Sequence, residues 1–177
     1  MVSGYAGTGK TVLINQFLKP LVLGRGYFIS GKMDQLRKNI PYAAFLDAFR
    51  NLIMQLMTES EKQLSYWKKT ILRVLKKNSS VMTELIPELE YIIGKQPPAE
   101  ILSPKEAEYR FSMIFRDFMG IFADRKHPLV IFLDDLQWAD NACIKLINSL
   151  IGDTNLSSLL LVLAYRQNEV SEAHPLA

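Results

Sequence analysis

The stretch Gly4-Tyr5-Ala6-Gly7-Thr8-Gly9-Lys10-Thr11 matches the pattern G-x-x-x-x-G-K-[ST] at every fixed position. Glycines let the backbone turn through positive φ and bring several N–H groups against phosphate oxygens. Lys10 supplies a point charge near the β- and γ-phosphates of a nucleotide and is predicted to act in both binding and catalysis, and Thr11 offers a hydroxyl group to Mg²⁺. We therefore predict that residues 4–11 bind nucleotide phosphates. The alternative is a glycine-rich turn that happens to carry a lysine.

A pair of acidic residues follows an apolar run later in the chain. Leu129-Val-Ile-Phe-Leu133 predicts a buried strand, and Asp134 and Asp135 come directly after it. A phosphate loop predicts a metal-holding aspartate at the end of another apolar strand. We therefore predict that Asp134 holds Mg²⁺ directly or through a water. Asp135 is predicted to orient or deprotonate the attacking water. The alternative is a pair of acids that ends a strand and caps the next turn.

The second acid of this pair is one methylene shorter than a glutamate. Because a misplacement of about 1 Å can cost roughly a hundredfold in rate, we expect slow hydrolysis that suits a switch rather than a motor. Farther along, Arg166 follows another apolar run at 159–164 and is predicted at the sheet edge where ligands bind. There it would sense the γ-phosphate or stabilise transition-state charge. The alternative is an ion pair with a surface carboxylate.

The sequence indicates the base of the nucleotide less clearly than it indicates the phosphate site. Gly31-Lys32-Met33-Asp34 superficially resembles the N-K-x-D box that reads guanine. It lacks the asparagine, however, and it precedes the acidic strand instead of following it. We therefore reject a guanine site, which favours ATP by default.

The order of the predicted elements gives the fold class. Strands are predicted at 26–30, 129–133 and 159–164, and helices at 11–18, 41–57, 64–75, 87–93, 104–122 and 141–151. The first helix is predicted to stop before Pro20, and Ser103 is predicted to form a capping box with Glu106. Strands that alternate with helices indicate an α/β fold with a parallel sheet. We predict a core at 1–40 and 127–177, with a mainly helical insertion at 41–126.

The composition excludes several classes of protein. Of the 177 residues, 49% are hydrophobic and 22% charged, which excludes a mostly disordered chain, and a net charge of +3 gives no reason to expect nucleic acid. The single cysteine, Cys143, excludes a disulfide framework and a cysteine zinc site. The apolar runs are far shorter than the roughly 20 residues that cross a bilayer. Because no charged-then-apolar leader precedes the first motif, we expect a cytoplasmic protein without a membrane partner.

The remaining features of the sequence lead to predictions about individual strands and helices. Only Val2 and Ser3 represent the strand that precedes a phosphate loop, so we expect a fragment that lacks most of its first strand. The apolar stripe between Phe111 and Phe122 is predicted to be helical core, and Asp140 to cap the helix at 141–151. The helix at 64–75 has a basic face, which is expected to be solvated or else to meet an acidic partner or nucleic acid; it consists of Lys68, Lys69, Arg73, Lys76 and Lys77.

Several segments together resemble one protein family. They are residues 4–11, 25–32, 39–42 and 86–90, and the run Phe132-Leu-Asp-Asp-Leu-Gln-Trp-Ala-Asp140, whose Leu-Gln-Trp-Ala-Asp part is the most specific. The chain is similar to the AAA-like ATPase domain of the signal-transducing STAND class, which is related to origin-recognition ATPases. In large bacterial and fungal kinases, this domain follows a serine/threonine-kinase-like region and precedes sensor and histidine-kinase modules.

This resemblance implies a P-loop NTPase fold with a three-layer αβα core. It also implies an ATP- and Mg²⁺-binding regulatory domain, with the flanking kinase and sensor modules of the same polypeptide as its partners. It implies Lys10 and Thr11 at the phosphates and Mg²⁺, Asp134 at the metal, Asp135 at the water and Arg166 as the sensor residue. The helical lid that follows the sensor strand in this family is not expected within this chain. Two alternatives remain open: a non-catalytic scaffold whose helical insertion binds a protein partner, or an origin-recognition-like ATPase that acts on DNA.

Overall fold

The computed structural model describes residues 1–23, 26–37, 40–125 and 127–170. The chain forms two compact units. The sheet unit comprises residues 1–48 and 123–177, and the helical unit comprises residues 49–122. The insertion predicted at 41–126 starts earlier and ends later than the helical unit.

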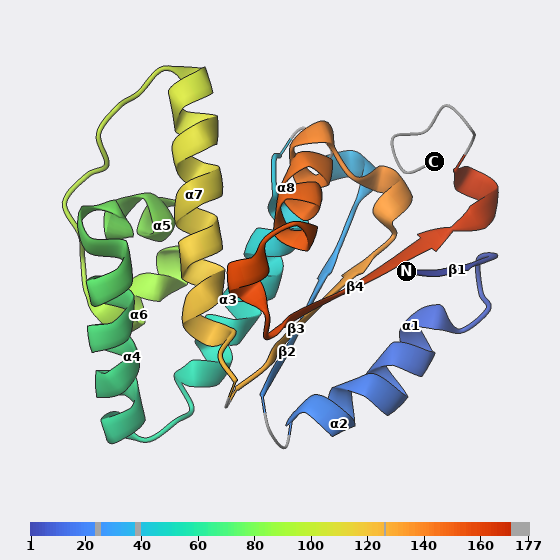
Figure 1. Ribbon diagram of the computed structural model, residues 1–177, viewed down its shortest axis with the longest axis horizontal. Helices are drawn as coiled ribbons and strands as arrows, with labels where there is room; N and C mark the ends of the chain where they lie inside the picture. The colour runs from blue at the N-terminus through green and yellow to red at the C-terminus, as the bar shows by residue number, and fades with distance from the viewer. Residues whose placement is uncertain (24–25, 38–39, 126, 171–177) are drawn as a thin grey trace. The chain divides into compact units, whose positions relative to one another are not determined.

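The sheet unit is built on four strands: β1 (Val2–Gly4), β2 (Tyr27–Lys32), β3 (Leu129–Asp134) and β4 (Leu159–Arg166). They are all parallel and lie in the order β1-β4-β3-β2 (Figure 1). This arrangement confirms the predicted α/β fold with a parallel sheet. Gly4 lies opposite Arg166, and Lys32 lies opposite Asp134, so the residues of the predicted site come together at the carboxyl edge of the sheet.

β3 is buried along its whole length because helices cover both faces of the sheet. One face is covered by a helical segment made of α1 (Lys10–Leu13), a π-helical turn (Ile14–Leu18) and α2 (Lys19–Leu23) (Figure 1). On the other side of the sheet lies α8 (Asn141–Ile151). The core beneath the first helical segment is formed by Ile14, Phe28, Val130, Phe132 and Ala164.

The first helical segment extends farther than the sequence predicts. The predicted end before Pro20 is wrong, because α2 carries the segment through Pro20 to Leu23. The preceding π-helical turn accounts for this difference: the N–H of Lys19 donates to the carbonyl of Ile14, five residues earlier. A widened turn of this kind shifts the hydrogen-bond pattern that a proline would otherwise break.

α3 (Ala43–Leu56) begins close against β2. A Cβ atom on Gly31 would lie 1.9 Å from the carbonyl oxygen of Ala44, so only glycine fits at this position. The close approach packs the start of α3 against the end of β2, directly before Lys32. The residue that follows the glycine is therefore held at the carboxyl edge of the sheet.

Aromatic packing organises the helical unit. Besides the later turns of α3, this unit contains α4 (Glu61–Leu75), α5 (Ser79–Leu85), α6 (Glu90–Ile93) and α7 (Pro104–Phe122). The ring of Phe49 lies 5.2 Å from the rings of Phe115 and Phe118, which confirms that the apolar stripe of α7 is core. α5 is not predicted from the sequence, because a seven-residue helix that contains two serines has too little apolar periodicity to be detected.

Two predicted helix starts are confirmed by capping hydrogen bonds. Glu106 accepts a hydrogen bond from the backbone N–H of Ser103 at 3.2 Å before α7, and Asp140 accepts one from the N–H of Cys143 at 2.8 Å in α8. Each bond satisfies a donor at a helix start. None of the described helices is long and apolar enough to span a lipid bilayer.

Candidate functional site

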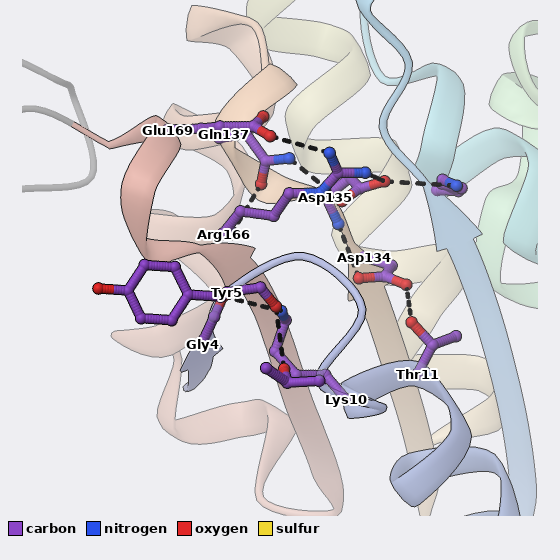
Figure 2. Close-up of polar contacts among 11 residues, drawn as sticks. Gly4, Tyr5, Lys10, Thr11, Asp134, Asp135, Gln137, Arg166 and Glu169 are labelled. Atoms are coloured by element: carbon purple, nitrogen blue, oxygen red, sulfur yellow. Dashed lines mark hydrogen bonds and ion pairs between the residues drawn. The ribbon is translucent and has the colours of Figure 1, made fainter.

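The loop predicted to bind phosphate connects β1 to α1 at the carboxyl edge of the sheet (Figure 2). Gly7 and Gly9 have φ values of 78° and 82°, in the left-handed region that favours glycine. Thr8 closes the turn, since its hydroxyl group donates a hydrogen bond to the carbonyl oxygen of Tyr5 at 2.9 Å. The loop thus has the tight backbone turn for which its glycines are required.

The ammonium group of Lys10 folds back over this loop. Its Nζ atom donates hydrogen bonds to the carbonyl oxygens of Gly4 and Tyr5, both at 2.9 Å (Figure 2). Both partners are neutral, and a hydrogen bond from a cation to an anionic oxygen is stronger than one to a carbonyl. The position of Lys10 is therefore one from which a phosphate group can attract it.

Thr11 and Asp134 bring the loop and the acidic strand together. The hydroxyl group of Thr11 donates to Oδ2 of Asp134 at 2.5 Å, across 123 positions of the sequence. The other oxygen of Asp134, Oδ1, accepts a hydrogen bond from the backbone N–H of Asp135 at 2.9 Å. A hydroxyl and a carboxylate oxygen in contact form the kind of oxygen pair that Mg²⁺ uses when phosphates and waters supply its remaining ligands.

The donor set fits Mg²⁺ bound together with a nucleotide rather than a metal held by protein alone. Within the described part of the chain, no group of three His, Cys, Asp or Glu side chains could hold a metal ion. Mg²⁺ at nucleotide sites commonly binds through one or two protein groups plus substrate phosphates. Thr11 and Asp134 together meet this requirement.

Asp135 lies at the centre of a second cluster of polar side chains. Its backbone is left-handed, with φ at 54°, and directs the side chain toward the end of β4. Oδ1 accepts hydrogen bonds from Nε of Arg166 at 3.0 Å and Nε2 of Gln137 at 3.1 Å. Oδ2 faces Nη2 of Arg166 and Nζ of Lys32, both at 3.3 Å. Both carboxylate oxygens of Asp135 are therefore engaged in this structure.

These contacts keep Asp135 ionised. Burial alone would raise its pKa, but hydrogen bonds from Gln137 and Lys32, together with the charge of Arg166, outweigh burial and hold the pKa below its usual range. On the other side of the pair, a hydrogen bond to Glu169 at 2.8 Å, followed by the charge of Asp135, raises the pKa of Arg166. At neutral pH the two residues form an ion pair.

Three members of this second cluster were not among the site residues predicted from sequence: Lys32, Gln137 and Glu169. Lys32 belongs to the segment rejected as a guanine box, and only the register that places it opposite Asp134 reveals its contact with the acidic pair. Gln137 lies in the Leu-Gln-Trp-Ala-Asp run, which is the most specific part of the family resemblance and could have pointed to this residue. The run does not indicate, however, which residues the Gln137 side chain contacts. Glu169 follows Arg166 by three positions in a short turn, which local spacing could have suggested.

Comparison with known proteins assigns the family. Residues 1–163 match the family model described as the AAA ATPase domain. The chain belongs to the AAA ATPase domain family. This confirms the predicted AAA-like ATPase resemblance and identifies an ATP-binding domain.

Two relatives of this AAA ATPase domain are histidine kinases. The chain is 41% identical over 151 residues to Hybrid signal transduction histidine kinase G of Dictyostelium discoideum and 27% identical over 162 residues to Histidine protein kinase 1 of Candida albicans. The matches cover 85% and 82% of this chain but only 4% and 6% of those proteins. The domain therefore occurs within much longer signalling kinases, as the resemblance implies. No solved structure shows significant similarity to the chain.

Proposed function

We propose that this AAA ATPase domain is a switch that binds Mg²⁺-ATP and hydrolyses it slowly, to regulate a larger signalling protein. The observation that carries the proposal is the contact between Thr11 and Asp134 at 2.5 Å. It joins the two sequence motifs that a P-loop ATPase needs, although 123 positions separate them. The histidine kinase relatives support a regulatory role in signal transduction.

ATP binding would begin at the loop. The left-handed turns at Gly7 and Gly9 would let backbone N–H groups of the loop face phosphate oxygens, and Lys10 would exchange two neutral carbonyl partners for anionic oxygens. Thr11 and Asp134 would hold Mg²⁺, which neutralises charge on the phosphates when it is bound. Each of these side chains thus acts mainly on the affinity for the nucleotide.

Hydrolysis would depend on the second cluster. Asp135 is ionised and can orient a water, or accept its proton, as the water oxygen bonds to the γ-phosphorus and ADP leaves. To do so it must release one contact, and the ion pair with Lys32 is the weakest candidate, because the Lys32 side chain is 71% exposed. Arg166 would stabilise the charge that develops on the transferred group. The short side chain of Asp135 supports slow turnover.

The proposal is tested by Mg²⁺-ATP binding to Lys10→Ala, with Lys19→Ala as the matched control. Lys19 is an exposed lysine on the same helical segment. Losing a charged hydrogen bond to phosphate should weaken ATP binding about tenfold to a hundredfold in Lys10→Ala, while Lys19→Ala binds like the wild type. Equal affinity of the two variants would reject the loop as the ATP site.

A second candidate is a non-catalytic scaffold, which a feature of the helical unit favours. A groove of about 550 Å³ runs along α7, and its lining is mostly apolar, with Leu102, Tyr109, Met113 and Ile114 among the contributing residues. In this case nucleotide only stabilises the sheet unit, and the groove binds a protein partner. ATP binding without phosphate release by the full-length signalling protein would favour this candidate over the switch.

A further inference from the structure

Gln137 connects the two groups on which the proposed hydrolysis depends. Its side-chain Oε1 accepts a hydrogen bond from the backbone N–H of Arg166, and its Nε2 donates one to Oδ1 of Asp135, both at 3.1 Å. Because Nε of Arg166 donates to the same Oδ1, the three residues form a closed ring of hydrogen bonds (Figure 2). Only 3% of the surface of Gln137 is exposed, against 7% for Asp135.

We infer that Gln137 is a positioning residue that fixes Asp135 and Arg166 relative to each other. The inference rests on the proposed ATP hydrolysis, in which Asp135 orients the water and Arg166 stabilises charge. Gln137 would act through these two side chains. It needs no contact with nucleotide.

The chemistry of the site requires a side-chain amide at this position. The backbone N–H of Arg166 can only donate, and the ionised carboxylate of Asp135 can only accept. A side-chain amide offers one acceptor and one donor in a fixed plane, so the two partners also determine which way the Gln137 amide faces. A carboxylate at this position would satisfy Arg166 but repel Asp135, and an aliphatic side chain would satisfy neither.

The backbone places the amide where it is needed. Asp135 turns the chain through a left-handed conformation, and a 3₁₀ turn over Leu136–Trp138 follows at once. The N–H of Trp138 donates to the carbonyl of Asp135 at 3.0 Å, which closes the turn. The side chains at 135 and 137 are thereby brought together at the end of β4. An aspartate in the left-handed conformation requires stabilising contacts from its surroundings, and the hydrogen bond from Gln137 is one of them.

Loss of Gln137 should therefore change the rate of hydrolysis and spare the affinity for ATP. The hydrogen bonds of Gln137 in the ring go to Asp135 and Arg166, whereas the phosphates are assigned to the loop and to Lys10. A small displacement of a water-orienting carboxylate lowers the rate steeply. A residue that only stabilised the fold would lower affinity and rate together, through loss of folded protein.

The test compares Gln137→Glu with Gln137→Met. Gln137→Glu keeps an acceptor for the N–H of Arg166 but places a second carboxylate against Asp135, and Gln137→Met removes both hydrogen bonds while nearly preserving the shape. Leu136→Met, a buried neighbour in the same turn, is the control. For each variant we would measure the Kd for Mg²⁺-ATP, the kcat of phosphate release, the Tm, and the hydrogen exchange of the Arg166 amide by NMR in nucleotide-free protein.

We expect kcat to fall about tenfold or more in both Gln137 variants, with Kd within about threefold of the wild type. The Arg166 amide should exchange about tenfold faster in Gln137→Met and remain protected in Gln137→Glu, because only the latter keeps the acceptor. Leu136→Met should resemble the wild type in every measurement.

The inference is overturned if folded Gln137→Met keeps kcat within about twofold of the wild type or leaves the exchange of the Arg166 amide unchanged. If Gln137→Met does not fold, Gln137→Glu decides through its kcat and Kd. If the wild-type protein releases no phosphate, the proposed hydrolysis has failed. The amide exchange then decides whether Gln137 positions Arg166, independently of activity.

Discussion

Two polar clusters share the carboxyl edge of the sheet and are built in opposite ways. In the loop cluster (Gly4, Tyr5, Thr8 and Lys10), the side-chain contacts join residues at most six positions apart, and every acceptor is a neutral carbonyl. The acid cluster (Lys32, Asp135, Gln137, Arg166 and Glu169) joins side chains at the ends of β2, β3 and β4 and contains paired charges. Thr11 and Asp134 form the contact between the loop side and the acidic side.

We propose that this difference gives the two clusters separate tasks. The loop cluster can exchange its carbonyl partners for phosphate oxygens with a gain in hydrogen-bond strength. The acid cluster is already held by ion pairs and a buried amide, so its geometry is set before a ligand binds. We therefore expect changes in the loop cluster to alter affinity and changes in the acid cluster to alter rate.

The largest effect is expected for Asp135→Asn. The amide has nearly the same shape as the carboxylate but cannot accept a proton from water, so phosphate release should fall about a hundredfold or more. The Kd for Mg²⁺-ATP should stay within about threefold, since we propose that the phosphates bind at the loop cluster. Single-turnover phosphate release and equilibrium binding measure the two quantities. An equal loss of affinity and rate would contradict the proposal that the loop cluster sets the affinity for ATP and the acid cluster sets the rate of hydrolysis.

Cys143 tests whether α8 and the loop cluster open together. Burial in α8, followed by the neighbouring charge of Asp140, raises its pKa to about 12, so at pH 8 its thiol stays protonated and reacts only when the sheet unit opens. If this opening requires ATP release, ATP at a hundred times its Kd should slow labelling by a thiol reagent about a hundredfold. Labelling that ATP does not slow would show that α8 opens while the loop stays closed on its ligand.

The same thiol gives a dependence of stability on pH. Because its folded pKa lies above the ordinary value of 9.0, its contribution to stability is fully present below pH 9 and is lost as the pH rises toward about 12. The loss should approach about 1.4 kcal/mol per pH unit in that window. Urea unfolding at pH 8 and pH 10 measures it, and Cys143→Ala should show a correspondingly smaller alkaline decrease. An identical decrease in both proteins would contradict the assignment.

Asp134→Asn tests the contact between the clusters. Removing the charge of a proposed Mg²⁺ ligand should raise the Mg²⁺ concentration needed for half-maximal ATP binding about tenfold. A Mg²⁺ titration at fixed ATP measures the shift. Asp117→Asn, an exposed aspartate of the helical unit, serves as the matched control and should titrate like the wild type. No shift in Asp134→Asn would remove this residue from the metal site.

The smallest effect is expected for Lys32→Ala. An ion pair whose lysine is 71% exposed contributes about 0–1 kcal/mol, so the Tm should change little. Phosphate release should stay equal or rise up to about threefold, because Asp135 loses the contact it would release most readily. Thermal unfolding and steady-state phosphate release measure both. A loss of rate comparable to that of Asp135→Asn would place Lys32 in the working site.

Local patterns predicted much of the fold, and they failed where the structure depends on unusual backbone or on distant contacts. Apolar runs identified β3 and β4, because a parallel strand covered on both faces is apolar throughout. Aromatic and β-branched residues identified β2. Proline was a misleading stop signal at position 20, since a π-helical turn accommodates it. Local patterns also failed to predict the role of Gln137. Its hydrogen-bond partner Arg166 lies 29 positions away in the sequence, and the two residues come into contact only because β3 and β4 pair.

The sequence alone determined the positions of the glycine-rich loop and of the acidic pair, because glycine conformations, a lysine and strand-end aspartates are properties of short segments. Folding decided which side chains surround Asp135. Parallel pairing brings Lys32, Asp134 and Arg166 to one edge, and the left-handed turn at Asp135 brings it to Arg166. A local sequence pattern cannot predict these contacts, since hydrogen bonds and charge interactions depend on distances of a few ångströms in space and not on separation along the chain.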